Sequence, residues 1–377
     1  MFLLSFRAER SVVEESREAT NGSATGSIDS ARDDRSLDKI GIFGEPSGFS
    51  MPKHTLTGNI KRHRAFPSKI LGNRRDILVY LPRSYRRLSR RRYPVLYLHD
   101  GQNVFDAATS FSGVEWGVDE TAERLIKEGL IEPLIVVAVA NTGEQRIHEY
   151  APTRGVIEAK AKRKRRSKGL ARKYARFLMD ELKPYIDRKY RTNPDAEFTG
   201  LGGSSLGGLV TLAIGVLYPQ VFSRLIVMSP SIWWDDFAIY RIVDSIEQKP
   251  PMKIWLDTGS AEPGWEQARE LLNRLLEKGW KLQKDLQYME AQGANHSETA
   301  WAARVEPALR FLFPGGLGVG GVGLGGDGGS GIGVPKESFS LQPLAVNLKD
   351  VHEAADEIPI LLICESTIAG RPGELTR

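Results

Sequence analysis

The chain has 377 residues, of which 41% are hydrophobic, and a formal net charge of +5. This length suits one large domain or two small ones, and the composition is that of a globular protein able to bury a sizeable core. The charge is too small to indicate nucleic-acid binding, and no stretch approaches the roughly 20 apolar residues of a membrane helix. We therefore expect neither nucleic acid nor a membrane among the partners.

Residues 1–50 are rich in Ser, Arg, Glu and Gly and show no sustained hydrophobic period, so we expect a disordered segment. The opening apolar run, MFLLSF, is shorter than the roughly 7–15 apolar residues of a secretory signal and is followed at once by charged residues. Met51 stands at the edge of the ordered zone and is an alternative translation start, which N-terminal sequencing of the native protein would test. The single cysteine, Cys364, allows no intramolecular disulfide. These features predict a cytoplasmic protein.

Residues 55–314 form the predicted domain, in which short apolar strands alternate with helices. The expected strands are Ile77–Leu81, Val95–Leu98, Leu134–Ala140, Glu197–Leu201, Leu225–Met228, Lys253–Leu256 and Leu286–Met289. Helices are expected over 118–130 and 173–189, from Leu206, from Trp265 to Glu277, and from Glu298. This alternation predicts an α/β fold with a mostly parallel central sheet flanked by helices.

Two further segments follow the predicted domain. Residues 315–335 are glycine-rich, which predicts a flexible linker. Residues 336–377 form a poorly defined tail, and its apolar run Ile358–Ile363 is too short to be a core of its own.

The pattern GxSxG occurs once between an expected strand and an expected helix, as Gly203-Ser204-Ser205-Leu206-Gly207. In a nucleophile elbow a serine sits on a sharp strand-to-helix turn, and glycines two residues away on either side leave room for that turn. Only Ser205 has glycine at both offsets, so it is the candidate nucleophile. The simpler interpretation is a glycine-rich loop that happens to contain serines.

A general base and an acid should follow the nucleophile in that order. Of the six histidines only His296 and His352 follow Ser205, and His352 lies beyond the glycine-rich linker. His296 directly follows the last expected strand, so it is the candidate base. The segment KIWLDTGSAEPGW offers Glu262 and Asp257 as the acid, and we prefer Glu262 because it lies out in the loop.

The oxyanion of an acyl-transfer reaction needs two N–H donors. One should be the backbone N–H of Leu206, directly after the nucleophile, and the backbone N–H of Gln102 in the loop after an early strand is the candidate for the other. Trp233 and Trp234 follow the expected strand Leu225–Met228 and are candidates for walls of a substrate pocket, although tryptophan is as often simply core.

From about Thr55 to Pro314 the chain resembles the esterase family of the α/β-hydrolase superfamily that includes enterochelin (ferric enterobactin) esterases. The motifs that carry the resemblance are LPRSY (81–85), YLHDGQNVFD (97–106), RIHEYAPT (146–153), YARFLMDELKPYID (174–187), GGSSLGG (202–208), MSPSIWW (228–234) and GANHSE (293–298). The resemblance implies Ser205 as nucleophile and His296 as base. Several relatives carry an aspartate at the position of Glu262, which is a mild departure since both carboxylates serve in such triads.

The segment from Lys160 to Lys173 holds the densest cluster of Lys and Arg and looks like an insertion relative to the family. Its simplest interpretation is a solvated basic loop; the sharper hypothesis is a rim that attracts anionic substrates.

Together these features predict a serine hydrolase that cleaves a small carboxylic ester through an acyl-enzyme intermediate. No metal or organic cofactor is expected, since no His/Cys/Asp set has metal-ligand spacing. An acyltransferase with the same residues, and a catalytically silent binding protein on this fold, remain as alternatives.

Overall fold

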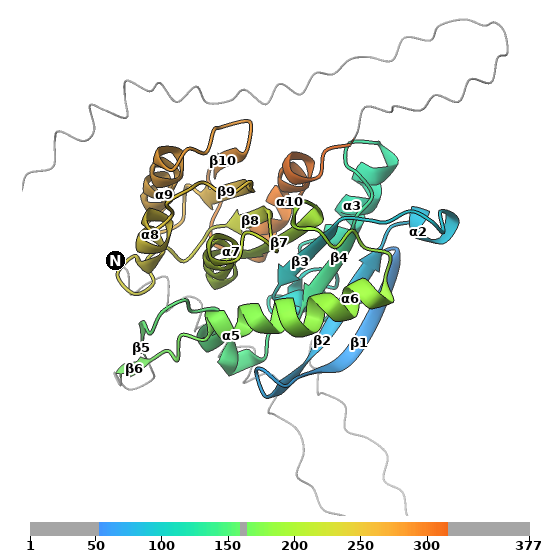
Figure 1. Ribbon diagram of the computed structural model, residues 1–377, viewed down its shortest axis with the longest axis horizontal. Coiled ribbons are helices and arrows are strands. Elements are labelled where there is room, and N and C mark those ends of the chain that lie inside the picture. The colour runs from blue at the N-terminus through green and yellow to red at the C-terminus, as the bar shows by residue number, and fades with distance from the viewer. Residues whose placement is uncertain (1–52, 159–163, 316–377) are drawn as a thin grey trace, which may run out of the picture. The chain divides into compact units, whose positions relative to one another are not determined.

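A computed structural model of the protein describes residues 53–158 and 164–315 (Figure 1). The predicted disordered segment 1–50, Met51, the predicted linker beyond Gly315 and the tail lie outside the described residues. Within the described part of the chain, no helix is long and apolar enough to cross a membrane.

The centre of the described part is an eight-stranded sheet in the order β1-β2-β4-β3-β7-β8-β9-β10. Its strands are β1 (Asn59–Ser68), β2 (Asn73–Leu81), β3 (Val95–His99), β4 (Ile135–Val139), β7 (Thr199–Ser204), β8 (Arg224–Met228), β9 (Lys253–Gly259) and β10 (Leu286–Ala291). The pairings β1–β2 and β2–β4 are antiparallel, and all the others in this sheet are parallel. The predicted mostly parallel sheet is therefore confirmed.

Helices cover both faces of this sheet (Figure 1). One face carries α5 (Ala171–Arg176), η4 (Phe177–Leu182), α6 (Lys183–Lys189), α7 (Leu206–Leu217), α8 (Ala238–Asp244) and α9 (Glu266–Glu277). The other carries α3 (Val118–Lys127) and α10 (Glu298–Leu312). Short elements complete the chain: α2 (Ser84–Arg87), η1 (Gly101–Asn103), η2 (Gly143–Gln145), α4 (Arg146–Glu149), η5 (Ala196–Phe198) and the two-stranded β5 (Val156–Glu158) and β6 (Lys164–Arg166).

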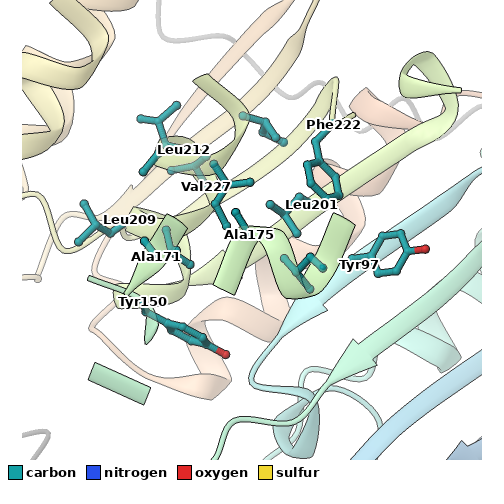
Figure 2. Packing of buried hydrophobic residues seen from close by; sticks show 14 of the residues in the cluster. Tyr97, Tyr150, Ala171, Ala175, Leu201, Leu209, Leu212, Phe222 and Val227 are labelled. Atoms are coloured by element: carbon teal, nitrogen blue, oxygen red, sulfur yellow. The ribbon is translucent and has the colours of Figure 1, made fainter. Parts of the chain in front are cut away.

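The continuous apolar runs of the central strands follow from burial on both faces. In β3, Val95 and Tyr97 belong to the cluster under one helix layer, whereas Leu96 and Leu98 belong to the other. Figure 2 shows side chains of the first of these clusters, among them Tyr97 of β3, Leu201 of β7, Val227 of β8 and Leu212 of α7. A one-residue shift in register would exchange the two faces.

Besides the short elements, which were not predicted, three features differ from the sequence prediction. β1 was not expected, because its side chains are largely exposed and a bulge between His63 and Phe66 breaks its period of two. α8 was not expected either. The helix predicted over 173–189 is present but is interrupted by the π-helical turn η4. Pro184 lies two residues after this turn, and a proline ring cannot fit a regular α-helix interior, which accounts for the widened turn.

The parallel strands place their carboxyl ends along one edge of the sheet. The segments after β3, β7, β8, β9 and β10 all start from this edge. Every residue predicted for the site lies in or next to one of these segments.

Candidate active site

Ser205 lies at the turn between β7 and α7, with backbone angles φ 57° and ψ −123°. Few non-glycine residues adopt a positive φ, and such a conformation costs about 1–3 kcal/mol. The turn is held by the backbone N–H of Ser205, which donates to the carbonyl of Met228, and by that of Ser231, which donates to the carbonyl of Ser205. This is the local geometry of a nucleophile elbow.

His296 lies in the loop between β10 and α10 and is paired with Glu262. Nδ1 of His296 lies 2.8 Å from Oε2 of Glu262, and the Glu262 side chain is only 6% exposed. Trp301 packs edge-on against the imidazole, with ring centroids 4.9 Å apart. Burial opposes ionisation of Glu262, but hydrogen bonds from His296, Ser229 and the backbone of Gly259 outweigh it and lower the pKa of this carboxyl. The loop therefore holds an ionised carboxylate against one imidazole nitrogen.

Asp257, the alternative acid, has other partners. Its carboxylate is fully buried near the end of β9, 2.9 Å from a guanidinium nitrogen of Arg304, and accepts a 2.6 Å hydrogen bond from Nε1 of Trp255. Burial raises the pKa of Asp257 to about 6, in spite of the Arg304 charge and the Trp255 donor. The structure thus brings Glu262, and not Asp257, to His296.

A small hollow of about 390 Å³, its open mouth included, is lined by His296 and Glu262. Oγ of Ser205 lies 3.2 Å from Oγ of Ser231, and Ser231 lines this hollow together with His296. Trp233 also lines it, half-buried. Trp234 is instead completely buried, and a Cβ on Gly155 would lie only 2.6 Å from its ring. Of the two tryptophans considered from the sequence, only Trp233 borders this hollow.

The loop after β3 supplies the second predicted oxyanion segment. Gln102 lies in η1 and Leu206 is the first residue of α7, so both backbone N–H groups belong to first turns, where amides have no partner within the helix. The two segments are neighbours, because a Cβ on Gly207 would lie 3.5 Å from Oδ2 of Asp100. A site with two amides at hand can stabilise a developing oxyanion.

Asp100 holds this loop in place. It has a left-handed backbone, φ 54°, and its carboxylate is bound by Arg146 through two contacts of 2.8 and 2.9 Å and by Nδ2 of Asn141 at 2.7 Å. Burial opposes its ionisation, but the charge of Arg146 and the hydrogen bonds from Arg146 and Asn141 together outweigh burial and lower the pKa of Asp100.

Sequence reasoning missed Ser229, Ser231 and Arg304. The two serines lie in the MSPSIWW motif, of which the sequence analysis considered only the two tryptophans as site residues. A signal for Arg304 was present: it lies among Trp301, Val305 and Ala308 on the apolar stripe of α10, where an unpaired charge would be costly.

The chain is similar to known proteins in sequence and in structure. Residues 68–312 match the family described as Putative esterase. The chain belongs to this esterase family. Ferri-bacillibactin esterase BesA of Bacillus subtilis is 30% identical over 245 residues, which span 59% of this chain and 80% of that protein.

Solved structures show the same fold. The BES protein of Bacillus cereus superposes with a TM-score of 0.53 at 25% identity, over 68% of this chain and 97% of that one. An IroE-like serine hydrolase from Shewanella oneidensis superposes with a TM-score of 0.54 at 22% identity, over 68% and 80% of the two chains. This esterase therefore has the α/β-hydrolase fold and is a carboxylic ester hydrolase of the enterochelin esterase-like type. The alternative of a catalytically silent binding protein is thereby disfavoured.

Proposed function

We propose that this esterase is a serine hydrolase that works through an acyl-enzyme intermediate. Oγ of Ser205 attacks the ester carbonyl carbon, while His296 takes its proton and passes it to the leaving alcohol. Water, activated by His296, then cleaves the acyl–serine ester, releases the acid and returns the proton to Ser205. The observation that carries the proposal is a strained serine at a strand-to-helix turn, whose hydroxyl contacts Ser231 in the wall of the hollow that the His296–Glu262 pair also lines.

The remaining parts of the site have defined roles in this mechanism. Glu262 orients the imidazole of His296 and stabilises the imidazolium that forms. The N–H groups of Leu206 and Gln102 stabilise the oxyanion of the tetrahedral intermediate. Because the role of Gln102 uses its backbone, its side chain is free to accept the N–H of Asn141 at 3.2 Å.

The substrate we propose is an ester with an aromatic and anionic part. Trp233 and Trp265 give the hollow aromatic walls, and the guanidinium of Arg269 lies 4.5 Å from the ring centroid of Trp265. The similarity to the ferri-bacillibactin esterase of Bacillus subtilis supports the assignment to siderophore-like esters.

Exposed cations support the anionic part of this proposal. Arg165, Arg166 and Lys168 are exposed on and after β6, and no ion pair involves them among the described residues. The base of the β5–β6 hairpin is near Trp234, since the N–H of Ser167 donates to the carbonyl of Gly155 and Gly155 packs on the Trp234 ring, whose centroid lies 5.9 Å from that of the hollow-lining Trp233. Positive charge at such a place increases the encounter rate with anionic esters.

A fluorophosphonate probe tests the nucleophile. We expect the full-length protein to form a covalent adduct that peptide mass spectrometry places on Ser205. Ser205→Ala should abolish labelling, whereas Ser204→Ala should retain it, because Ser204 ends β7 and is not at the turn. An adduct on another residue, or none in folded protein, would overturn the proposal.

Transfer of the acyl group to an alcohol would use the same residues. Product analysis with added alcohol acceptors separates the two reactions, since a hydrolase yields chiefly the free acid and an acyltransferase chiefly the new ester.

A further inference from the structure

Ser229 is the centre of a buried hydrogen-bond network behind Glu262. Its Oγ lies 2.6 Å from Oε1 of Glu262, 3.1 Å from Nε1 of Trp301 and 3.1 Å from a guanidinium nitrogen of Arg304. Indole and guanidinium N–H groups can only donate, and a serine hydroxyl has a single proton. Both donors therefore fill the acceptor positions of Ser229, and its proton is committed to Glu262.

Arg304 and Asp257 set the charge around this network. Their side chains are 2% and 0% exposed and lie 2.9 Å apart, and Arg304 also lies 3.6 Å from Oε1 of Glu262. A buried cation is costly unless it is paired. Because Asp257 neutralises Arg304, the guanidinium can approach Glu262 while the other oxygen of Glu262 stays with His296.

The charges balance when His296 carries a proton. Above the Asp257 pKa of about 6 both carboxylates are ionised, and with the guanidinium of Arg304 they sum to one negative charge. That charge complements the imidazolium that forms during the proposed reaction. A neutral residue at 257 or 304 would upset this balance.

We propose that Ser229, Arg304 and Asp257 are positioning residues, which fix the direction and the charge of Glu262 and through it the imidazole of His296. This inference rests on the proposed serine mechanism. None of the three side chains is required to touch the substrate; they act through Glu262.

The titratable groups that face His296 and Glu262 come from β9, from α10 and, with Asp100, from the loop after β3. β9 contributes Asp257, and α10 contributes Arg304 and Glu298, whose pKa is raised by burial and by the nearby Asp100, with Ser112 and His296 acting against this. Among these, Asp257 is the carboxylate that neutralises Arg304.

The variant Asp257→Asn leaves the Arg304 charge uncompensated. The electrostatic potential at His296 then becomes more positive, which makes the protonated form of His296 less stable.

The first test is the variant Ser229→Gly. Ser229 has a φ of 39°, a conformation that glycine adopts without strain, so the variant should fold. We expect kcat for a p-nitrophenyl ester to fall about tenfold or more, the size expected for a lost hydrogen bond to a charged group, with KM within about twofold.

Ser223→Ala is the matched control. Ser223 directly precedes β8 as Ser229 directly follows it, is also buried, and donates its hydroxyl to the carbonyl of Ala196 at the opposite edge of the sheet. This variant loses a buried hydrogen bond without touching the site, so kcat should stay unchanged.

The second test is the pH profile of kcat/KM in Asp257→Asn, which is isosteric. We expect the midpoint of the acidic limb to move down by about half a pH unit or more, because the uncompensated Arg304 disfavours the imidazolium. A purely structural role would lower the plateau and leave this midpoint in place. If Ser229→Gly keeps wild-type kcat and Asp257→Asn keeps the midpoint, while Ser205→Ala is inactive, the positioning proposal is wrong and the mechanism stands. If Ser205→Ala stays active, both are overturned.

Discussion

At the scale of single residues, the two carboxylates of one loop illustrate what the sequence could decide. Asp257 and Glu262 are five residues apart, and each was chemically suitable. The structure separates them because β9 turns the Asp257 side chain into the buried contact with Arg304, whereas the following turn carries Glu262 to His296. The position in the loop was enough to favour Glu262, but the partner that holds Asp257 in the interior, Arg304 of α10, is not revealed by any local pattern around residue 257.

Glu262→Gln is the corresponding prediction. It keeps the shape of the side chain but removes the charge that stabilises the His296 imidazolium, so we expect kcat to fall between about 10²- and 10⁴-fold. Since the pKa of Glu262 is lowered, wild-type Glu262 stays ionised from neutral pH to below the usual titration range of glutamate, and its protonation should not limit activity there. Steady-state kinetics with a p-nitrophenyl ester measure this.

Glu266→Gln is the control for this change. Glu266 is exposed in the first turn of α9, four residues after Glu262, and should tolerate the substitution. Equal kcat values for the two variants would contradict the role of Glu262.

At the scale of elements, the glycines of the elbow that leave no room for a side chain are not the same as those that the GxSxG motif names. The pattern singles out Gly203 and Gly207, yet a Cβ on Gly207 would meet only ordinary contacts, the nearest at 3.5 Å. A Cβ on Gly208 would lie 2.8 Å from the carbonyl oxygen of Met228. The tight approach of α7 to the end of β8 therefore depends on Gly208 as well as on the motif.

Gly208→Ala should push α7 away from the segment that carries Ser229 and Ser231. We expect a loss of about 1–3 kcal/mol in the free energy of unfolding, together with reduced kcat. Gly207→Ala should cost less stability, since its Cβ has room and alanine favours the helix. Denaturant unfolding of both variants measures the difference, and a Gly208→Ala protein as stable as Gly207→Ala would contradict this packing.

Most elements were predictable because their patterns are local. The apolar runs of the central strands and the helical spacing of α3, α9 and α10 indicated them. β1 was not predicted because a largely exposed strand with a bulge shows no alternation of apolar and polar residues. η4 was not predicted because the amino-acid composition of a π-helical turn is that of an α-helix.

At the scale of the whole molecule, strand–helix alternation predicted the layered parallel sheet, and the order of the nucleophile, acid and base predicted that they meet at one edge. The order of the strands in the sheet could not be predicted from the sequence, because β4 pairs with β2 and β3 through contacts between residues that are distant along the chain. The antiparallel edge formed by β1 and β2 was beyond it for the same reason.

The charge distribution gives a prediction for the whole surface. Replacing Arg165, Arg166 and Lys168, the basic rim on and after β6, by glutamine should lower kcat/KM for an anionic ester severalfold at low ionic strength. The reason is that the uncharged rim attracts the anionic substrate less. The loss should shrink at high salt, where exposed charges are screened, and be absent for a neutral ester.

The control removes the same number of cations at the opposite edge of the sheet. Arg86, Arg87 and Arg90 are exposed after β2, whose end pairs with the start of β4. If kcat/KM for the anionic ester falls equally in this variant and in the rim variant, or falls in neither, the basic rim on and after β6 does not attract anionic substrates to the site.

The central claim is that Ser205 is the nucleophile of this esterase. Hydrolysis of a short-chain p-nitrophenyl ester by the wild type and by folded Ser205→Ala protein tests it most directly. The account predicts turnover by the wild type and a loss on the order of a thousandfold or more in kcat in the variant. Equal turnover by the two proteins would contradict it.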